Sequence, residues 1–401
     1  MQAPRSGVSD PGGVSTIPAT PVDVSSLPRP DVIPRAVMRQ LLGGGDWLSS
    51  WWSVVGAGVL VVALVVLAVV RRRRRRRGWP WVAVSAFVTV LGLGLTANVI
   101  AGYVPNMLAL RVSLASWGFG EAPGLKHGTA QERDGGSGQG ASTAVQVPAP
   151  ADLRMPTDSL TWVYTPPGYD PAGTTRYPVV YLVHGSPGAS GDWFAAGNVA
   201  QAMDVLIRAG RVQPMIVVAP DVNGTGPSPR DTECLDSTTG GSQVDTYLTD
   251  VLVPWVDAHY RTVADRSGRA FGGFSSGGYC ALDHGLRHAD QFAAVLAMGP
   301  YADPGEGGHE MLATQAEWDA HDVMKYAPTI ALPSPLTLFL SVPADEDSMS
   351  VRHAAQVATT LAGRGVDVVW REEPGQTHTW TMARATLPYA LVTASEHLTA
   401  S

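Results

Sequence analysis

Ser275 lies in the kind of sequence that displays a catalytic nucleophile. Residues 273–277 read Gly-Phe-Ser-Ser-Gly, a G-x-S-x-G pattern between a short apolar run and a helical pattern. In such a pattern the serine occupies a strained turn between strand and helix, and its small neighbours let the hydroxyl point outward. Glycine and serine are abundant in this chain, so the pattern by itself fits an ordinary turn equally well. The residues that follow decide between the two interpretations.

A serine nucleophile needs an imidazole that takes its proton and a carboxylate that orients the imidazole. Three adjacent acidic residues at 345–347 and then His378 follow Ser275 along the chain. The order nucleophile, acid, base is one that catalytic triads use. We predict that His378 is the general base. Asp347 is the predicted acid and Asp345 the alternative, and at least one of the three acidic residues should be merely solvated.

The tetrahedral intermediate of ester cleavage carries a negative oxygen that needs two backbone N–H donors. One donor is expected from Ser276, the residue after the nucleophile. The other is expected from Ser186 in the segment 184–188, His-Gly-Ser-Pro-Gly, which follows an early strand-like run. The two glycines of this segment allow the chain to approach the site closely. His184 itself is expected to be a structural residue of the loop.

Short apolar runs alternate with helical patterns from about residue 142 onward. The expected strands are residues 160–164, 179–183, 215–219, 269–273, 294–298, 336–340 and 366–370, and the expected helices include 199–209, 247–259, 276–288, 350–363 and 380–397. Several runs are apolar on both faces, as strands covered by helices on both sides must be. The alternation predicts an α/β domain with a mostly parallel sheet. Because ligands bind beyond the carboxyl ends of such strands, the segments singled out above should converge.

Two uncharged apolar runs precede this domain, at residues 47–70 and 79–103, and seven arginines at 71–77 separate them. At 1.5 Å per residue, each run can cross a hydrocarbon core of about 30 Å. Tryptophans and a tyrosine cluster at the ends of the runs, where amphipathic rings prefer the membrane interface. Cationic loops stay on the cytoplasmic side. The sequence therefore predicts a multi-pass membrane protein of two helices, with everything outside the hairpin extracytoplasmic.

Composition divides the chain into four segments. Residues 1–46 are rich in proline, serine and glycine without a period, which predicts a flexible tail. Residues 47–105 form the predicted transmembrane hairpin, whose arginine-rich loop is cytoplasmic. Residues 106–141 are predicted to be a juxtamembrane segment and a glycine-rich linker. Residues 142–401 form the predicted catalytic domain, and their length suits one α/β domain.

The charge of the chain excludes some partners. The formal net charge is -7, and leaving out the seven clustered arginines lowers it to -14. So acidic a remainder argues against a nucleic-acid partner. No metal or other cofactor is predicted. The acidic residues of the long loop before residue 245 have no calcium-loop spacing, so we expect them to be solvated; they are Asp221, Asp231, Glu233 and Asp236.

The chain has two cysteines, Cys234 and Cys280. Two cysteines are too few for a disulfide scaffold, and no zinc-binding spacing is present in the sequence. A single bridge would suit an exported domain, whereas two buried thiols would leave the same pattern. Both possibilities stay open at this level.

Four segments carry a resemblance to a known family: they read YPVVYLVHGSPG (177–188), DVLVPWVDAHYRT (250–262), GGFSSGGY (272–279) and GQTHTW (375–380). Together they resemble the putative esterase family of α/β-hydrolases, which contains esterase D and the antigen 85 mycolyltransferases. The resemblance covers roughly residues 142–395 and implies an α/β-hydrolase fold. It also implies an acyl-serine mechanism that uses Ser275, His378 and an acid near Asp347. The chain has Pro343 and Ala344 where the family has a glycine at the head of the acid loop, so the acid stays open.

These observations support three hypotheses about function. The first is a membrane-anchored, extracytoplasmic serine esterase that acts on small-molecule or lipid acyl esters. The second is an acyltransferase of the mycolyltransferase type, which passes the acyl group to a sugar hydroxyl instead of water. The third is a non-catalytic binding domain on a membrane anchor. In either enzyme, the long loops at 222–245 and 299–311 are expected to set specificity; no oligomeric state is predicted.

Overall fold

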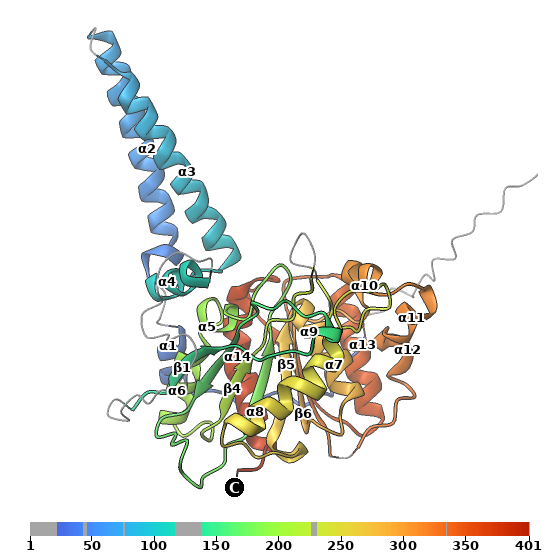
Figure 1. The fold of residues 1–401 in the computed structure, drawn as a ribbon. Helices are drawn as coiled ribbons and strands as arrows, with labels where there is room; N and C mark the ends of the chain where they lie inside the picture. The colour runs from blue at the N-terminus through green and yellow to red at the C-terminus, as the bar shows by residue number, and fades with distance from the viewer. Residues whose placement is uncertain are drawn as a thin grey trace, which may run out of the picture.

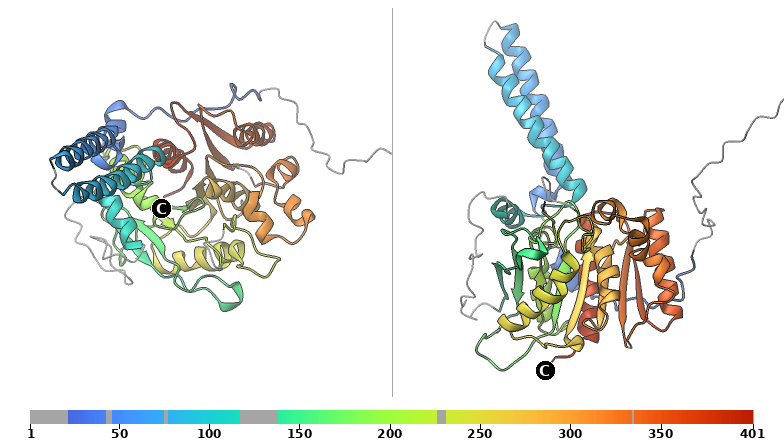
Figure 2. Two further views of the ribbon diagram at one scale, coloured as in Figure 1. Left: turned by 90° about the horizontal axis from the view of Figure 1, so that it is seen from above. Right: turned by 45° about the vertical axis from the view of Figure 1, so that its right-hand side comes forward.

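The computed structural model describes residues 22–42, 46–74, 77–116, 138–225, 231–333 and 335–400. These residues form an α/β domain and a hairpin of two long helices that projects from one end of it (Figure 1). The C-terminal end of the chain lies at the opposite end of the α/β domain. Figure 2 shows the same arrangement in two turned views.

An eight-stranded sheet forms the centre of the α/β domain, in the order β1-β2-β4-β3-β5-β6-β7-β8. The strands are β1 (Ala141–Val145), β2 (Thr161–Thr165), β3 (Val179–Val183), β4 (Ile216–Ala219), β5 (Arg269–Phe274), β6 (Ala294–Met298), β7 (Thr337–Pro343) and β8 (Asp367–Glu373). β2 runs antiparallel to both of its neighbours, and the strands from β4 to β8 are parallel. The predicted mostly parallel sheet is confirmed. β1 was not predicted, because its sequence ASTAV lacks a run of large apolar residues.

Helices cover both faces of the sheet. They are α1 (Arg35–Leu42), α5 (Asp192–Ala195), α6 (Val199–Arg208), α7 (Val244–Thr246), a π-helical segment (Tyr247–Leu252), α8 (Val253–His259), α9 (Ser276–Arg287), α10 (Gly305–Met311), α11 (Gln315–Ala320), α12 (Val323–Tyr326), α13 (Met349–Gly363) and α14 (Trp380–His397), with short 3-10 turns at Ala151–Leu153 and Arg266–Gly268. Side chains of β3 alternate between two apolar clusters, with Tyr181 in one and Leu182 in the other. Helices α8, α9 and α13 contribute to the first cluster, and α6 and α14 to the second. The five predicted helices are confirmed.

The N-terminal strap (residues 22–42) packs on the α/β domain, although the sequence predicted a flexible tail there. Leu27 and Ile33 are buried, with 7% and 2% of their surface exposed. The backbone N–H of Trp370 donates to the carbonyl of Pro28 at 2.8 Å. Trp370 belongs to β8, which is an edge strand, and a strap along such an edge occupies hydrogen-bonding groups that would otherwise be free. The prediction was therefore wrong for these residues.

The hairpin consists of α2 (Trp51–Arg73) and α3 (Trp79–Ala101), both long and apolar enough to cross a membrane. Most of their apolar side chains are exposed, for example Val59 at 65%. A continuous exposed apolar surface of this kind marks contact with lipid or protein. At its foot lie a 3-10 turn (Trp47–Ser49) and α4 (Met107–Ser116). The predicted linker falls largely on residues 117–137, which lie outside the described residues.

Candidate active site

Ser275 stands on a sharp turn between β5 and α9. Its backbone torsions are φ 63° and ψ -120°, a conformation that costs a non-glycine residue about 1–3 kcal/mol. The neighbouring positions require glycine, because a Cβ on Gly273 or Gly277 would collide with adjacent backbone. The strained turn predicted from the G-x-S-x-G pattern is therefore present. Ser275 itself is half-buried at the carboxyl end of β5.

His378 lies in the loop between β8 and α14, and its Nε2 is 2.9 Å from Ser275 Oγ. The imidazole stacks on Phe274, with the ring centroids 4.9 Å apart. Gly299 lies beside both rings, because a Cβ there would be only 3.1 Å from His378 Cε1 and 3.1 Å from Phe274 Cε2. Burial against these neighbours lowers the pKa of His378, and the charge of Glu346 opposes this effect only in part. The lowered pKa favours the neutral imidazole, which is the form able to accept a proton.

The structure does not bring the predicted acid, Asp347, to the imidazole. Its carboxylate is 82% exposed and accepts two hydrogen bonds from Arg352, at 3.0 and 2.9 Å. Glu346 lies closer to the base, because its Oε1 accepts a hydrogen bond from the backbone N–H of His378 at 2.6 Å. No contact joins the alternative acid, Asp345, to His378, and among the described residues no carboxylate hydrogen-bonds to the His378 Nδ1. The structure thus contains a serine–histidine pair with Glu346 at its edge.

The loop after β3 lies directly against the nucleophile. A Cβ on Gly185 would be 3.1 Å from the Cβ of Ser275. Ser186, the expected source of one oxyanion donor, follows in this loop and is half-buried. His184 holds the loop in place, because its Nδ1 bonds the Gly185 carbonyl at 2.8 Å and its Nε2 accepts the backbone N–H of Val222 at 3.3 Å. This bonding fits the structural role predicted for His184.

Two acidic residues, the half-buried Asp231 and the buried Glu233, lie beside Ser276, the other expected oxyanion donor. The Ser276 hydroxyl donates to Asp231 at 2.8 Å and to Glu233 at 3.2 Å, and the hydroxyl of Tyr301 donates to Glu233 at 2.5 Å. Glu233 is only 3% exposed. Burial and the nearby charge of Asp231 raise the pKa of Glu233 well above its ordinary value. The prediction that these loop acids are solvated was wrong for Glu233, whose neighbours come from distant segments.

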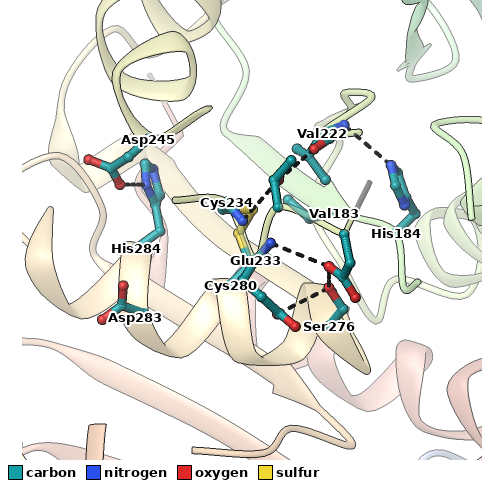
Figure 3. The surroundings of a disulfide bond; sticks show 12 residues. Val183, His184, Val222, Glu233, Cys234, Asp245, Ser276, Cys280, Asp283 and His284 are labelled. Atoms are coloured by element: carbon teal, nitrogen blue, oxygen red, sulfur yellow. Dashed lines mark hydrogen bonds and ion pairs between the residues drawn. A yellow bond between two sulfur atoms is a disulfide. The ribbon is translucent and has the colours of Figure 1, made fainter. Parts of the chain in front are cut away.

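Cys234 and Cys280 form a disulfide that joins the long loop to α9. Figure 3 shows the bridge next to Glu233 and Ser276. Cys280 lies one helical turn after Ser276, so the bridge fixes the acidic pair against the start of α9. Of the two possibilities that the sequence left open, the structure contains the disulfide.

A second polar cluster lies further along α9. The carboxylate of Asp245 hydrogen-bonds to His284 Nδ1 at 2.6 Å and to His288 Nε2 at 2.8 Å. These three side chains could together hold a metal ion. Burial alone would raise the pKa of Asp245, but the bonds and charges of the two histidines outweigh it and lower that pKa. Sequence analysis missed the cluster, although the two histidines are four residues apart on a predicted helix and share one face.

Comparisons with known proteins place these features in a family context. A family model described as a putative esterase matches residues 154–388, which is more than half of the chain. Esterase Rv1288 from Mycobacterium tuberculosis is 33% identical over 149 residues, or 35% of this chain and 30% of that protein. The chain spans less than two fifths of the length of the curated relatives that it matches.

Two solved structures share the fold. A ferulic acid esterase is 22% identical, with a TM-score of 0.55 over 65% of this chain and 98% of that chain. An S-formylglutathione hydrolase from Agrobacterium tumefaciens is 18% identical, with a TM-score of 0.55 over 68% of this chain and 100% of that chain. At such identities the likeness concerns the fold alone. The α/β-hydrolase fold expected from the sequence is confirmed.

Proposed function

Because this chain is a serine hydrolase that belongs to the putative esterase family, we propose that it hydrolyses carboxylic acyl esters at an extracytoplasmic membrane surface. The observation that carries this proposal is the 2.9 Å contact between Ser275 Oγ and His378 Nε2. A hydroxyl on a strained turn, bonded to a neutral imidazole, is the arrangement of an activated serine nucleophile. Membership of an esterase family favours an enzyme, so we do not pursue the hypothesis of a non-catalytic binding domain.

The proposed reaction has two halves. Ser275 Oγ attacks the ester carbonyl carbon while His378 Nε2 takes the hydroxyl proton. The backbone N–H groups of Ser276 and Ser186 stabilise the resulting oxyanion. His378 returns the proton to the departing alcohol, which leaves the acyl group on Ser275. A water molecule, deprotonated by His378, then attacks the acyl carbon, and the free acid departs as Ser275 regains its proton.

We assign Glu346 the role of positioning His378. Its carboxylate holds the backbone of the histidine loop at 2.6 Å, and its negative charge favours the imidazolium that forms during attack. Asp347 does not hold the histidine loop in this way, because both of its carboxylate oxygens accept hydrogen bonds from Arg352. Glu346 thus takes the place that the sequence analysis gave to Asp347.

Specificity in this proposal comes from two loops that pack on each other over the start of α9. A Cβ on Gly307 of α10 would be 2.7 Å from the carbonyl oxygen of Asp231. Tyr301, at the start of the same segment, bonds Glu233. The two loops that sequence analysis expected to wall the site therefore form one wall, braced by the disulfide.

Three observations support an extracytoplasmic position. The two hairpin helices have the length and composition of membrane spans. The arginine-rich connection between them would lie in the cytoplasm by the charge bias of membrane loops. The Cys234–Cys280 disulfide suits an oxidising compartment outside the cytoplasm. The arginine bias and the disulfide agree on the same side for the α/β domain.

Hydrolysis and acyl transfer differ in what accepts the acyl group, and one assay tests both. The full-length protein in detergent micelles is given a p-nitrophenyl acyl ester, with and without a large excess of trehalose. We expect free acid to appear in the same molar amount as p-nitrophenol under both conditions. An acylated sugar that forms at the expense of free acid would replace the esterase proposal with the acyltransferase hypothesis, and no release of p-nitrophenol would contradict both.

A further inference from the structure

We propose that the active site is held against the lipid surface, so that its substrate is an amphiphilic acyl ester embedded in the same leaflet. This inference rests on the proposed function and deepens it, because it names the class of substrate and its route of entry. The apolar chain of such an ester stays in the bilayer, while its carbonyl group lies at the level of the headgroups.

The hairpin foot (residues 46–49 and 98–107) is a rigid unit. Hydrogen bonds between side chains and backbone join the segment before α2 to the segment around the end of α3. The bonds run from Asn98 Nδ2 to the carbonyls of Leu48 (2.9 Å) and Val104 (2.8 Å), from the Val104 N–H to Asn98 Oδ1 (2.7 Å), and from the Met107 N–H to Asp46 Oδ2 (2.7 Å). The ends of the two helices that face the α/β domain are therefore bonded to each other.

The hairpin foot is also bonded to the α/β domain. The guanidinium of Arg384 in α14 donates to the carbonyl of Gly102 and, at 2.6 Å, to that of Ala196. Burial lowers the pKa of Arg384 to about 10, so the group remains charged at neutral pH. The hydroxyl of Tyr103 donates to the carboxylate of Asp192. These bonds fix the angle between the hairpin and the domain.

The elements that the hairpin foot contacts are the ones that carry the active site. Helix α14 begins at Trp380, two residues after His378. The ring of Trp380 packs edge-on against the ring of Tyr103, with the centroids 6.3 Å apart. Asp192 accepts the backbone N–H of Ala189 at 3.0 Å and so closes the loop that lies against Ser275. One residue of the hairpin foot, Tyr103, thus contacts both Trp380, which follows the His378 loop, and Asp192, which bonds the loop after β3.

No spacer separates the membrane span from these contacts. Helix α3 ends at Ala101, and the next residue, Gly102, is already bonded to the α/β domain. Trp51 and Trp52, at the same end of the hairpin, are 57% and 82% exposed, as residues of an interfacial aromatic belt would be. Tyr103, at the same end, is half-buried because it packs on the α/β domain. The catalytic loops therefore begin at headgroup depth, and Figures 1 and 2 show the hairpin leaving the domain beside α4 and α5.

The test compares substrates in the same and in separate vesicles. Full-length protein is reconstituted into phosphatidylcholine vesicles, and a fluorogenic long-chain ester is placed either in those vesicles or in a second population. We expect hydrolysis at least about tenfold faster in the same vesicles, because a shared bilayer raises the effective substrate concentration. A short, water-soluble ester with the same fluorophore should be cleaved at one rate in both arrangements.

Matched variants connect the effect to the hairpin foot. The Tyr103→Phe/Arg384→Met double variant should lose most of the same-vesicle advantage while its rate on the soluble ester stays within about twofold. Arg211→Met, which removes an ion pair to the N-terminal strap, should change neither rate. If the double variant does not fold, it loses soluble-ester activity too, and the wild-type comparison alone carries the test.

Two outcomes separate this inference from the proposed function. Equal hydrolysis of the long-chain ester in the same and in separate vesicles, with the soluble ester cleaved normally, would overturn the lateral route and leave the esterase intact. Failure to cleave either ester would overturn the esterase proposal and this inference with it.

Discussion

Replacing Ser275 with alanine is expected to lower kcat/KM for acyl esters by at least about 10⁴-fold, because the acyl-enzyme cannot form without the Oγ atom. Alanine keeps the Cβ and meets the same strained φ of 63°, so the fold should be retained. The measurement is the steady-state hydrolysis of a p-nitrophenyl ester by the full-length variant. The midpoint of thermal unfolding, compared with wild type, controls for damage to the fold.

A second variant tests whether serine and imidazole act as one unit. Adding His378→Ala to Ser275→Ala should cause no further loss, because each residue depends on the other for the same step. If the two losses multiply, Ser275 and His378 do not share a step, and the 2.9 Å contact would be structural only.

Glu346→Gln should lower kcat/KM by roughly 10²-fold, less than the ~10⁴-fold loss for a carboxylate bonded to the imidazole itself, because Glu346 bonds the backbone N–H of His378. The variant also has a signature in its pH profile. A general base must be unprotonated, so activity rises as pH increases through the pKa of His378, which burial already lowers. The Glu346 charge opposes that lowering. Without it the pKa falls further, and the acid limb of the profile should move to lower pH.

Asp347→Asn is the matched control for Glu346→Gln. It removes an equal charge one residue away, but the lost ion pair with Arg352 is largely solvent-exposed and should matter little. We expect kcat/KM within about twofold of wild type and an unmoved acid limb. The reverse pattern, with Asp347→Asn inactive and Glu346→Gln active, would restore the original assignment of the acid.

The sequence was sufficient to predict seven strands of the sheet, all except the edge strand β1, and the serine–histidine pair. Strand β3 was expected at 179–183 and lies there, because a short run that is apolar on both faces has few alternatives in an α/β domain. Parallel strands bring their carboxyl ends to one edge, so the order of the loops was enough to place Ser275 near His378. The prediction that Ser275 lies near His378 rested on the topology of a parallel sheet and not on local helix or strand propensity.

The acid could not be chosen from sequence, because spacing does not determine which way adjacent side chains point. Asp347 turns to Arg352 five residues on, whereas Glu346 turns to a backbone N–H that is 32 residues away. Glu233 was misjudged for a related reason, since its burial depends on Tyr301, 68 residues away. Both errors concern long-range partners that no local pattern records.

The N-terminal strap shows the same limit at the level of whole segments. Leu27 and Ile33 lie in a stretch rich in proline, serine and charged residues without a hydrophobic period, so composition indicated a solvated tail. Leu27 and Ile33 pack into different apolar clusters of the α/β domain, and the strap bonds both Trp370 through Pro28 and Arg211 through Asp31. Only the folded sheet provides a partner for this segment.

Mapping the site of a fluorophosphonate adduct on the full-length protein tests the account most directly, because such probes react with an activated serine and leave ordinary serines unmodified. We expect mass spectrometry to find one adduct, on the peptide that contains Ser275, and to find none in the His378→Ala variant. An adduct on Ser276 or another serine, or persistent ester hydrolysis by a protein that forms no adduct, would contradict the assignment of Ser275 as the nucleophile.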